Sequence, residues 1–244
     1  MKLSIIISCR NNEDNIKHLI DNLEKINIPK EVIVVDDGST DSTPEILERI
    51  KDQGRITLAA HKQRLGKGAS VRIGLEKATG DIIIIQDAES AYNPLDYYKL
   101  IEPFRFGVNV VYGTRWNTNS GEDAPAKATL GNKIILFMSN MLFGYGISDM
   151  RNGCKVIRSN ALKDMALESK GDEFSSEMTA KLIKRGYGIK EVPLPYGQDK
   201  ANSNERMRLI KDLASAWALV RYKFKEEART SPSSGLPHNK SIFF

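Results

Sequence analysis

The sequence predicts an α/β fold in which a mostly parallel, doubly wound sheet is covered by helices. Three runs of consecutive β-branched residues, at 5–7, 32–35 and 82–85, are typical of strands that are buried on both faces. Amphipathic helical patterns alternate with these runs along the first 115 residues. Strands and helices that alternate at this spacing are the pattern of a doubly wound sheet.

Each element of this first part follows from its local pattern. Runs rich in β-branched residues predict strands at 3–8, 31–37, 56–61, 81–87 and 108–114. Helical spacing of apolar residues predicts helices at 15–26, after Ser42, over about 68–78 and from Asn93 onward. Ser42 is a suitable N-cap and Pro44 suits the first turn that follows it.

The second part has a different texture. A polar loop (116–127) precedes an apolar helical stretch (127–143), and further segments follow in the order strand, helix, extended segment and long amphipathic helix, at 155–159, 175–186, 189–196 and 205–225. We therefore expect one large α/β domain over 1–200 and an amphipathic helical segment over 201–228. The Ser- and Pro-rich residues 229–244 are expected to be disordered.

Charge is unevenly distributed along the 244 residues, whose net charge is +5. Residues 1–100 carry 14 Lys and Arg against 16 Asp and Glu, whereas the remaining 144 residues carry 22 against 15. A basic second half suits an anionic partner, which could be a phosphorylated substrate, a membrane surface or nucleic acid. Nucleic acid is disfavoured because no stacking aromatic residues are interleaved with the cations.

The remaining composition indicates an intracellular protein. No apolar run reaches the roughly 18 residues of a spanning helix, and the apolar stretch near residue 5 is too short for a secretory signal. The two cysteines, Cys9 and Cys154, lack metal-ligand spacing and suggest a reducing compartment. The expected location is cytoplasmic, and the three histidines are expected at the surface.

Polar residues that could carry chemistry follow the predicted strands. Asp36 and Asp37 end the second strand, Asp87 and Glu89 follow the fourth, and a Gly-Lys-Gly turn around Lys67 precedes a helix. Ligands of doubly wound sheets bind at the carboxyl ends of the strands. Two carboxylates at i and i+2 can hold a hard cation together with a diphosphate. Each motif taken singly is more typical of an ordinary capped loop or turn, and the order and strand-end placement of the motifs favour a site.

Taken in order, these segments resemble family 2 glycosyltransferases of the GT-A fold, and in particular the dolichyl- and polyprenyl-phosphate mannose or glucose synthases. The segments that carry the resemblance span most of 3–196 and are SIIISCRNNEDNI, EVIVVDDGSTDSTPEIL, LGKGASVRIGLEKATGDIIIIQDAES, VVYGTR, SNMLFGYGISDMRNGCKVIRS and EMTAKLIKRGYGIKEVPLPY. The resemblance implies a Rossmann-like sheet, followed here by the C-terminal amphipathic helix.

The resemblance also implies roles for individual residues. Donor-binding residues would be Asn11, Asp36, Asp37, Gly38, Gly66, Lys67 and Asp87. Asp87 and Glu89 would hold Mg²⁺ or Mn²⁺, with Glu89 in place of the family's second Asp. Asp149 and Arg115 would be catalytic, as base and phosphate-facing cation, and Glu177 would be positional. The acceptor phosphate would be bound by Arg115, Lys127, Lys200 and Ser203.

Two departures from the family pattern affect these roles. The usual Pro-x-Tyr-Asn-Glu motif after the first strand is replaced by residues 8–12, so contacts with the donor base are expected to differ. An arginine that relatives carry after the EVP strand is absent. Lys200, Arg206 or Arg208 could supply that cation.

The resulting hypothesis is an inverting, metal-dependent hexosyltransferase that uses GDP-mannose or UDP-glucose and a polyprenyl or dolichyl phosphate at the cytosolic face of a membrane. The alternative acceptor is a saccharide hydroxyl, for which Asp149 would be needed as a base. A non-catalytic relative is a further alternative, supported only by Glu89. An NAD-type binder is disfavoured, because the glycine turn follows the third strand and lacks the third glycine.

Two helical stretches could contact the membrane peripherally. On the amphipathic helix one face would carry Ile210, Leu213, Ala214, Trp217 and Phe224. The cations of that helix are Arg206, Arg208, Lys211, Arg221, Lys223 and Lys225. Apolar residues beside cations are typical of an interfacial helix on anionic lipid. The stretch 134–143 is also apolar, and the alternative for both is that they cover the sheet.

Overall fold

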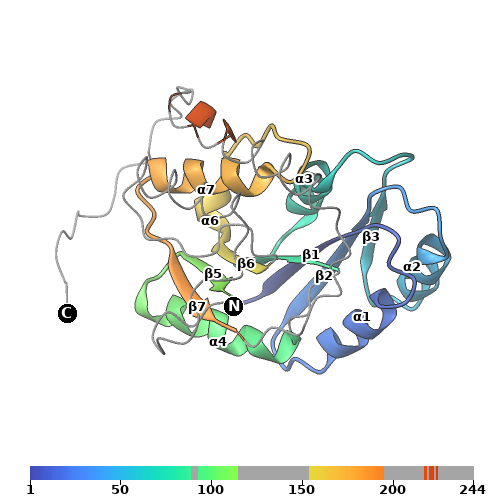
Figure 1. Cartoon of the computed structure of the whole chain (residues 1–244). Helices are drawn as coiled ribbons and strands as arrows, with labels where there is room; N and C mark the ends of the chain where they lie inside the picture. The colour runs from blue at the N-terminus through green and yellow to red at the C-terminus, as the bar shows by residue number, and fades with distance from the viewer. Residues whose placement is uncertain (89–92, 115–153, 195–216, 219, 223, 225–244) are drawn as a thin grey trace, which may run out of the picture.

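The computed structural model describes residues 1–88, 93–114, 154–194, 217, 218, 220–222 and 224 (Figure 1). Its strands are β1 (Leu3–Cys9), β2 (Lys30–Asp36), β3 (Thr57–Ala60), β4 (Ile82–Asp87), β5 (Val110–Thr114), β6 (Cys154–Arg158) and β7 (Lys190–Pro193). Its helices are α1 (Ile16–Glu24), α2 (Thr43–Asp52), α3 (Lys67–Lys77), α4 (Tyr97–Ile101), α6 (Ser159–Leu162) and α7 (Phe174–Lys184). The strands and helices predicted within these ranges are present, with bounds shifted by a few residues.

The described strands form one mixed sheet in the order β3-β2-β1-β4-β6-β5-β7. The first four strands are mutually parallel, as the β-branched runs predicted. β6 is antiparallel to both β4 and β5, and β7 returns parallel to β5. The sheet is therefore the mostly parallel α/β sheet that the sequence predicts, and β6 interrupts its parallel order.

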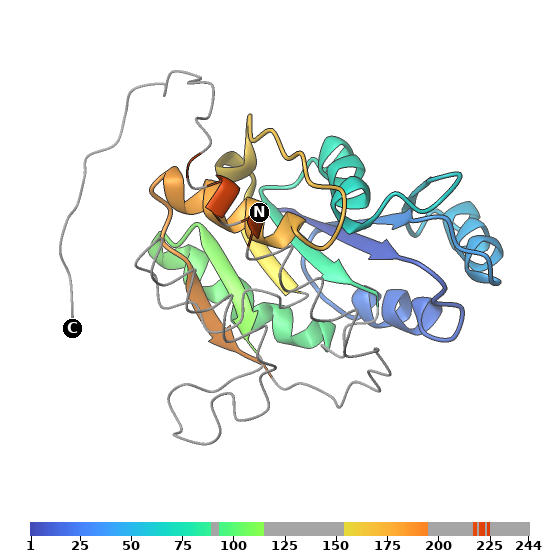
Figure 2. The same cartoon turned by 45° about the horizontal axis from the view of Figure 1, so that its top comes forward.

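Helices cover both faces of the sheet (Figures 1 and 2). On one face, α1, α2 and α4 pack on alternate strand residues such as Ile5 and Ile84, which are fully buried. On the other face, α3 and α7 pack on the intervening residues, including Ile6 and Ile85. Burial of both faces is the physical reason why these strands consist of continuous apolar residues rather than alternating ones.

The helix predicted from Asn93 is split into shorter pieces. A 3₁₀ turn, η1 (Pro94–Asp96), precedes α4, and a second, η2 (Glu102–Phe106), follows it. Pro103 lies in η2, where it has no N–H to continue an α-helical ladder. The apolar stretch 127–143 and residues 201–216 lie outside the described residues, so the predicted domain boundary at residue 200 stays a prediction.

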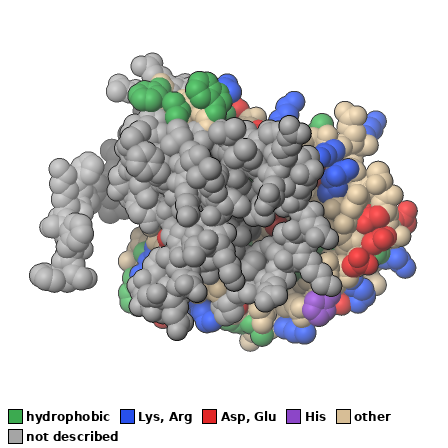
Figure 3. Space-filling view, viewed as in Figure 1, with side chains coloured by type: hydrophobic (Ala, Val, Ile, Leu, Met, Phe, Trp, Pro, Cys, Tyr) green, Lys and Arg blue, Asp and Glu red, His purple; other side chains and the backbone are tan. Residues whose placement is uncertain are grey.

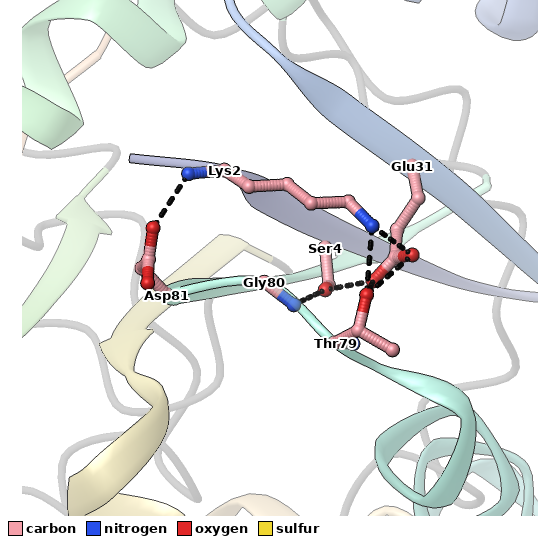
Figure 4. A network of polar contacts seen from close by, with 6 residues as sticks. All are labelled: Lys2, Ser4, Glu31, Thr79, Gly80 and Asp81. Carbon is pink, nitrogen blue, oxygen red and sulfur yellow. Dashed lines mark hydrogen bonds and ion pairs between the residues drawn. The ribbon is translucent and has the colours of Figure 1, made fainter.

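A network of polar contacts joins three segments at the amino ends of the parallel strands (Figure 4). The Glu31 carboxylate accepts hydrogen bonds from Lys2 Nζ at 2.7 Å, Ser4 Oγ at 2.5 Å and the Thr79 N–H at 2.7 Å. Ser4 Oγ in turn accepts from the Gly80 N–H at 2.7 Å. This network therefore fastens the start of β4 to β1 and β2.

The same contacts set the ionisation of Glu31. Burial by itself disfavours the charged form, but the hydrogen bonds from Lys2, Ser4 and Thr79 outweigh it and lower the pKa of Glu31 from 4.5 to about 2. A carboxylate whose pKa is lower in the folded state stabilises the fold above its unfolded pKa. That stabilisation is lost as pH falls through the interval between 4.5 and about 2.

We predict that Glu31→Gln lowers the free energy of unfolding by about 1–2 kcal/mol at neutral pH, after allowance for partial solvent screening. The difference from wild type should shrink as pH falls from about 4.5 and disappear near pH 2. Urea unfolding at a series of pH values measures it. Glu48→Gln, which alters an exposed pair with Lys51, is the control and should change little. A pH-independent difference for Glu31→Gln would contradict the prediction.

Candidate functional site

The carboxyl ends of the parallel strands bring the predicted acidic residues to one edge of the sheet. Cys9 at the end of β1 pairs with Asp36 at the end of β2. On the other side of β1, Ser8 pairs with Asp87 at the end of β4. The two acidic strand ends therefore flank β1, at the edge where doubly wound sheets bind their ligands.

Asn11 and Asp36 connect the loops that follow β1 and β2. Asp36 Oδ1 accepts hydrogen bonds from the Ser39 N–H at 3.1 Å and from Ser39 Oγ at 2.5 Å. Ser39 Oγ accepts from the Asn11 N–H at 2.9 Å, and Asn11 Oδ1 accepts from the Thr40 N–H at 2.9 Å. Asn11 has a positive φ of 52°, a conformation that Asn tolerates better than most residues. These hydrogen bonds join the loops after β1 and β2 into one hydrogen-bonded unit.

Asp37 holds the turn that precedes α3. Its carboxylate accepts hydrogen bonds from the N–H groups of Leu65 at 2.8 Å and Gly66 at 2.9 Å. His61 Nδ1 lies 2.9 Å from the same carboxylate, and the side chains of Asp37 and His61 are only 6% and 5% exposed. The surface position expected for His61 is therefore wrong. His61 directly follows β3, and its ring contacts Asp37, which no local motif indicated.

Gly38, in the loop after β2, lies against the backbone of the loop that precedes α3. Its φ of +69° lies in the left-handed region that favours glycine, and a Cβ there would come within 2.6 Å of the Gln63 carbonyl carbon. Gly38 therefore lets the loop after β2 approach the 61–66 loop. Close packing against the Gln63 backbone therefore requires a glycine at this position, which the family resemblance assigned to donor binding.

Lys67 and Asp87 form an ion pair at the same edge of the sheet. Lys67 Nζ lies 2.6 Å from Asp87 Oδ1 and 2.8 Å from Oδ2. The side chains are 18% and 34% exposed, so both groups are within reach of a ligand from solvent. An ammonium group in the first turn of α3 suits a ligand phosphate, and an exposed carboxylate oxygen suits a hard cation.

The surroundings of Cys9 show that this edge is electronegative. Burial raises the pKa of the Cys9 thiol to about 12, and the negative charges of Asp36, Asp41 and Asp37 add to this effect. Cys9 is therefore a protonated, buried thiol and not a nucleophile. A concentration of carboxylates beside β1 favours a cation at the edge.

The predicted metal ligands are Asp87 and Glu89, and the structure describes Asp87. Among the described residues, no group of three or more His, Cys, Asp or Glu side chains is placed to hold a metal ion. Mg²⁺ and similar ions need only one or two protein carboxylates when substrate phosphates complete their shell. Asp87, with its exposed oxygens, fits that requirement, and its predicted partner Glu89 lies outside the described residues.

The structure brings together one part of the predicted site. Asn11, Asp36, Asp37, Gly38, Gly66, Lys67 and Asp87 all lie at the carboxyl edge. The predicted residues Glu89, Arg115, Lys127, Asp149, Lys200 and Ser203 lie outside the described residues. His61 and Ser39 were not singled out from the sequence, although Ser39 belongs to the DDGST segment and could have been found there.

Comparison with known proteins gives a consistent picture. Residues 4–166 match the family model "Glycosyl transferase family 2". The chain is 29% identical over 227 residues to the low-salt glycan biosynthesis hexosyltransferase Agl6 of Haloferax volcanii, covering 90% of this chain and 52% of that protein. It thus spans about half the length of Agl6.

Two further similarities have fuller coverage. The UDP-N-acetylglucosamine–dolichyl-phosphate N-acetylglucosaminyltransferase of Methanococcus voltae is 29% identical over 210 residues, covering 78% of this chain and 83% of that protein. The crystal structure of glucosyl-3-phosphoglycerate synthase from Mycobacterium tuberculosis with Mn²⁺, UDP-glucose and phosphoglyceric acid superposes with a TM-score of 0.73. At 19% identity it covers 93% of this chain and 81% of the other. This likeness confirms the GT-A fold predicted from the sequence.

The contacts of Asp37 yield a prediction about stability. Asp37→Ala removes the acceptor of the part-buried Leu65 and Gly66 N–H groups, so we expect it to lower the free energy of unfolding by about 1–3 kcal/mol. Asp14→Ala, at an exposed position of the same charge, should stay within about 0.5 kcal/mol of wild type. Urea unfolding without nucleotide measures both. Equal stability of the two variants would show that Asp37 does not hold the turn.

Proposed function

Because the chain belongs to glycosyl transferase family 2, we propose that it transfers a hexose, mannose or glucose, from a nucleotide diphosphate sugar to a polyprenyl or dolichyl phosphate. The observation that carries the proposal is the Lys67–Asp87 pair, which places an ammonium group and a partly exposed carboxylate together at the carboxyl edge of the sheet. A nucleotide diphosphate with a divalent cation presents the complementary charges. GDP-mannose and UDP-glucose are the candidate donors.

Two of the similar proteins support a phosphate-bearing acceptor. The Methanococcus voltae relative is named for transfer to dolichyl phosphate. The Mycobacterium tuberculosis structure contains UDP-glucose and phosphoglyceric acid. The basic second part of this chain, with 22 Lys and Arg against 15 Asp and Glu after residue 100, suits such an acceptor.

In the proposed reaction an oxygen of the lipid phosphate attacks the anomeric carbon of the sugar. The bond between that carbon and the donor diphosphate breaks, and the nucleoside diphosphate leaves with the electron pair. A phosphate monoester has a second pKa near 6, so at neutral pH its oxygen is already charged and needs no base. Lys67 would neutralise developing charge on the leaving diphosphate.

The proposed cofactor is Mg²⁺ or Mn²⁺, held by Asp87 and Glu89. When bound, such an ion supplies further neutralisation of the diphosphate. Asp87 already shares its oxygens with Lys67, so the ammonium group and the ion would divide one carboxylate between them. The Mn²⁺ of the Mycobacterium tuberculosis structure supports a divalent ion in this fold.

The acceptor side of the proposal is carried by the family resemblance. Arg115, Lys127, Lys200 and Ser203 are proposed to bind the acceptor phosphate. Asp149 would act as a base only if the acceptor were a saccharide hydroxyl, which must lose a proton during attack. The identity of the acceptor therefore decides whether Asp149 is catalytic.

The direct test is incubation of the purified chain with radiolabelled nucleotide sugars, polyprenyl phosphate and MnCl₂, followed by organic extraction. The panel contains GDP-mannose, UDP-glucose and UDP-N-acetylglucosamine, the last because of the Methanococcus voltae relative. Label from a hexose donor in the organic phase is the expected result. Label confined to an added saccharide would replace the proposal by the hydroxyl-acceptor alternative.

We predict that Asp87→Asn lowers the transfer rate by about 10²-fold or more and weakens donor binding, because the substitution removes a charged oxygen ligand. Asp21→Asn is the control, since the Asp21 side chain is 36% exposed and also pairs with a lysine, but it lies on α1 and is not a predicted site residue. Single-turnover rates and calorimetric titrations with MnCl₂ or EDTA measure the effects. Donor affinity that is unchanged by EDTA in wild type would remove the metal from the proposal.

We further propose that the chain attaches peripherally to the cytosolic face of a membrane through its C-terminal helical residues. Trp217 and Phe224 are 67% and 73% exposed, and Arg221 is exposed between them, whereas Ala218 and Tyr222 are buried. Apolar side chains at the upper edge of Figure 3 lie beside a basic one. None of the described helices has the length and apolarity needed to cross a bilayer.

The expected consequence is that Trp217→Ser with Phe224→Ser reduces sedimentation with vesicles of phosphatidylcholine and phosphatidylglycerol. Salt at about 0.5 M should weaken wild-type binding because it screens attraction to the anionic lipid. Phe106→Ser removes an aromatic that is 80% exposed in η2 and should leave sedimentation unchanged. The proposal fails if the double variant sediments like wild type.

A further inference from the structure

We infer that Tyr222 is a positioning residue for the turn that carries Lys67, and that it acts through the 168–171 segment, which Glu177 also holds. The inference rests on the proposed function only in assigning that turn to the donor. The contacts join three parts of the chain that are far apart in sequence: the start of α3, the approach to α7 and the C-terminal helical residues.

The front of the 168–171 segment packs directly on the start of α3. The Ser169 carbonyl accepts a hydrogen bond from Arg72 Nη1 at 2.7 Å. The Lys170 carbonyl accepts from the Ala69 N–H at 3.2 Å, one of the first-turn donors that lack a partner within the helix. These two carbonyls therefore fix the first two turns of α3 from outside.

The glycines on either side of Lys67 are required by this contact. A Cβ on Gly66 would lie 2.4 Å from the Lys170 carbonyl oxygen, and the φ of Gly66 is +103°. A Cβ on Gly68 would lie 2.2 Å from the Ser169 carbonyl oxygen. The family resemblance implied a donor-binding role for Gly66. The structure shows that the 168–171 segment occupies the space in front of both Cα atoms.

The back of the segment is held by Glu177. The Glu177 carboxylate is fully buried and accepts hydrogen bonds from the N–H groups of Glu168 at 2.8 Å and Ser169 at 2.7 Å. Lys181 Nζ lies 2.7 Å from the same carboxylate and also donates to the Ala166 carbonyl. Burial opposes ionisation, but these donors outweigh it and lower the pKa of Glu177. A charged acceptor therefore fixes the segment from inside the fold.

Tyr222, from the C-terminal helical residues, contacts both the 168–171 segment and α7. Tyr222 is 3% exposed, and its ring lies 4.9 Å from Lys181 Nζ. Its hydroxyl lies 3.3 Å from Ser169 Oγ, and its carbonyl accepts from Lys184 Nζ at 3.1 Å. Tyr222 thus packs against both the lysine that pairs with Glu177 and the serine whose carbonyl holds α3.

Two sets of contacts fix the Lys67 turn. Asp37 binds the N–H groups of Leu65 and Gly66, and the 168–171 segment binds the helix that follows. Loss of either set should widen the range of positions that Lys67 samples relative to Asp87. A ligand that needs both charges in one arrangement then binds more weakly.

The test is hydrogen–deuterium exchange of the full chain, comparing wild type with Tyr222→Ala and Arg72→Met. Amides at 65–72 should exchange at least about fivefold faster in both variants, while those of α1 stay unchanged. Phe106→Ala is the control, because it removes an aromatic that is 80% exposed in η2. Tyr222→Phe retains the ring against Lys181 and should restore most of the protection.

Binding of UDP and of GDP, each with MnCl₂, gives the functional readout by calorimetry. The dissociation constant of the nucleotide that wild type binds should rise about three- to tenfold in Tyr222→Ala and stay unchanged in Phe106→Ala. Unchanged exchange at 65–72 in Tyr222→Ala would overturn the inference. An equal rise in exchange in α1 and α3 would also overturn it, since that shows general destabilisation. A wild type that binds neither nucleotide would count against the proposed function, and the exchange result would still decide the inference.

Discussion

The register of β1 between β2 and β4 is the constraint on which the candidate site depends. It places Cys9 beside Asp36 and Ser8 beside Asp87, so that two acidic strand ends lie on either side of one strand. Parallel strands buried on both faces cannot slip by one residue without turning apolar side chains to the opposite face. The packing of both cores therefore also fixes the separation of the acidic groups.

Carboxylates at the amino and carboxyl ends of the parallel strands differ in their hydrogen-bond partners and in their exposure. At the amino ends, Glu31 is enclosed by donors and fastens β4 to β1 and β2. At the carboxyl ends, Asp37 is similarly enclosed and shapes a turn, whereas Asp87 keeps its side chain one-third exposed. Exposure and partners, and not residue type, therefore separate the acids that hold the fold from the acid proposed to meet a ligand.

The face that carries α3 and α7 contains several buried polar side chains, among them Ser70, Glu177 and Lys181. Glu177 and Lys181 form a buried ion pair, and such pairs are costly unless their remaining hydrogen-bonding groups are satisfied. Here the partners are main-chain groups of the segment before α7 and the ring of Tyr222. This pair makes the packing of the C-terminal residues specific, which an apolar contact alone would do less well. The same contacts explain why Tyr222 is buried while Trp217 and Phe224 remain exposed.

Local pattern in the sequence determined the described strands and most of the described helices, and it predicted which acids lie at the carboxyl edge of the sheet. The β-branched runs fixed the parallel strands, and the acids and Lys67 that follow them could be assigned to one edge because parallel strands end together. Tertiary structure alone decided the rest. The burial of His61 against Asp37, the 168–171 segment in front of Gly66, and the choice of Tyr222 over Trp217 for the interior each depend on contacts between distant segments. Periodicity reports which residues share a face of one element, but it does not report which other element covers that face.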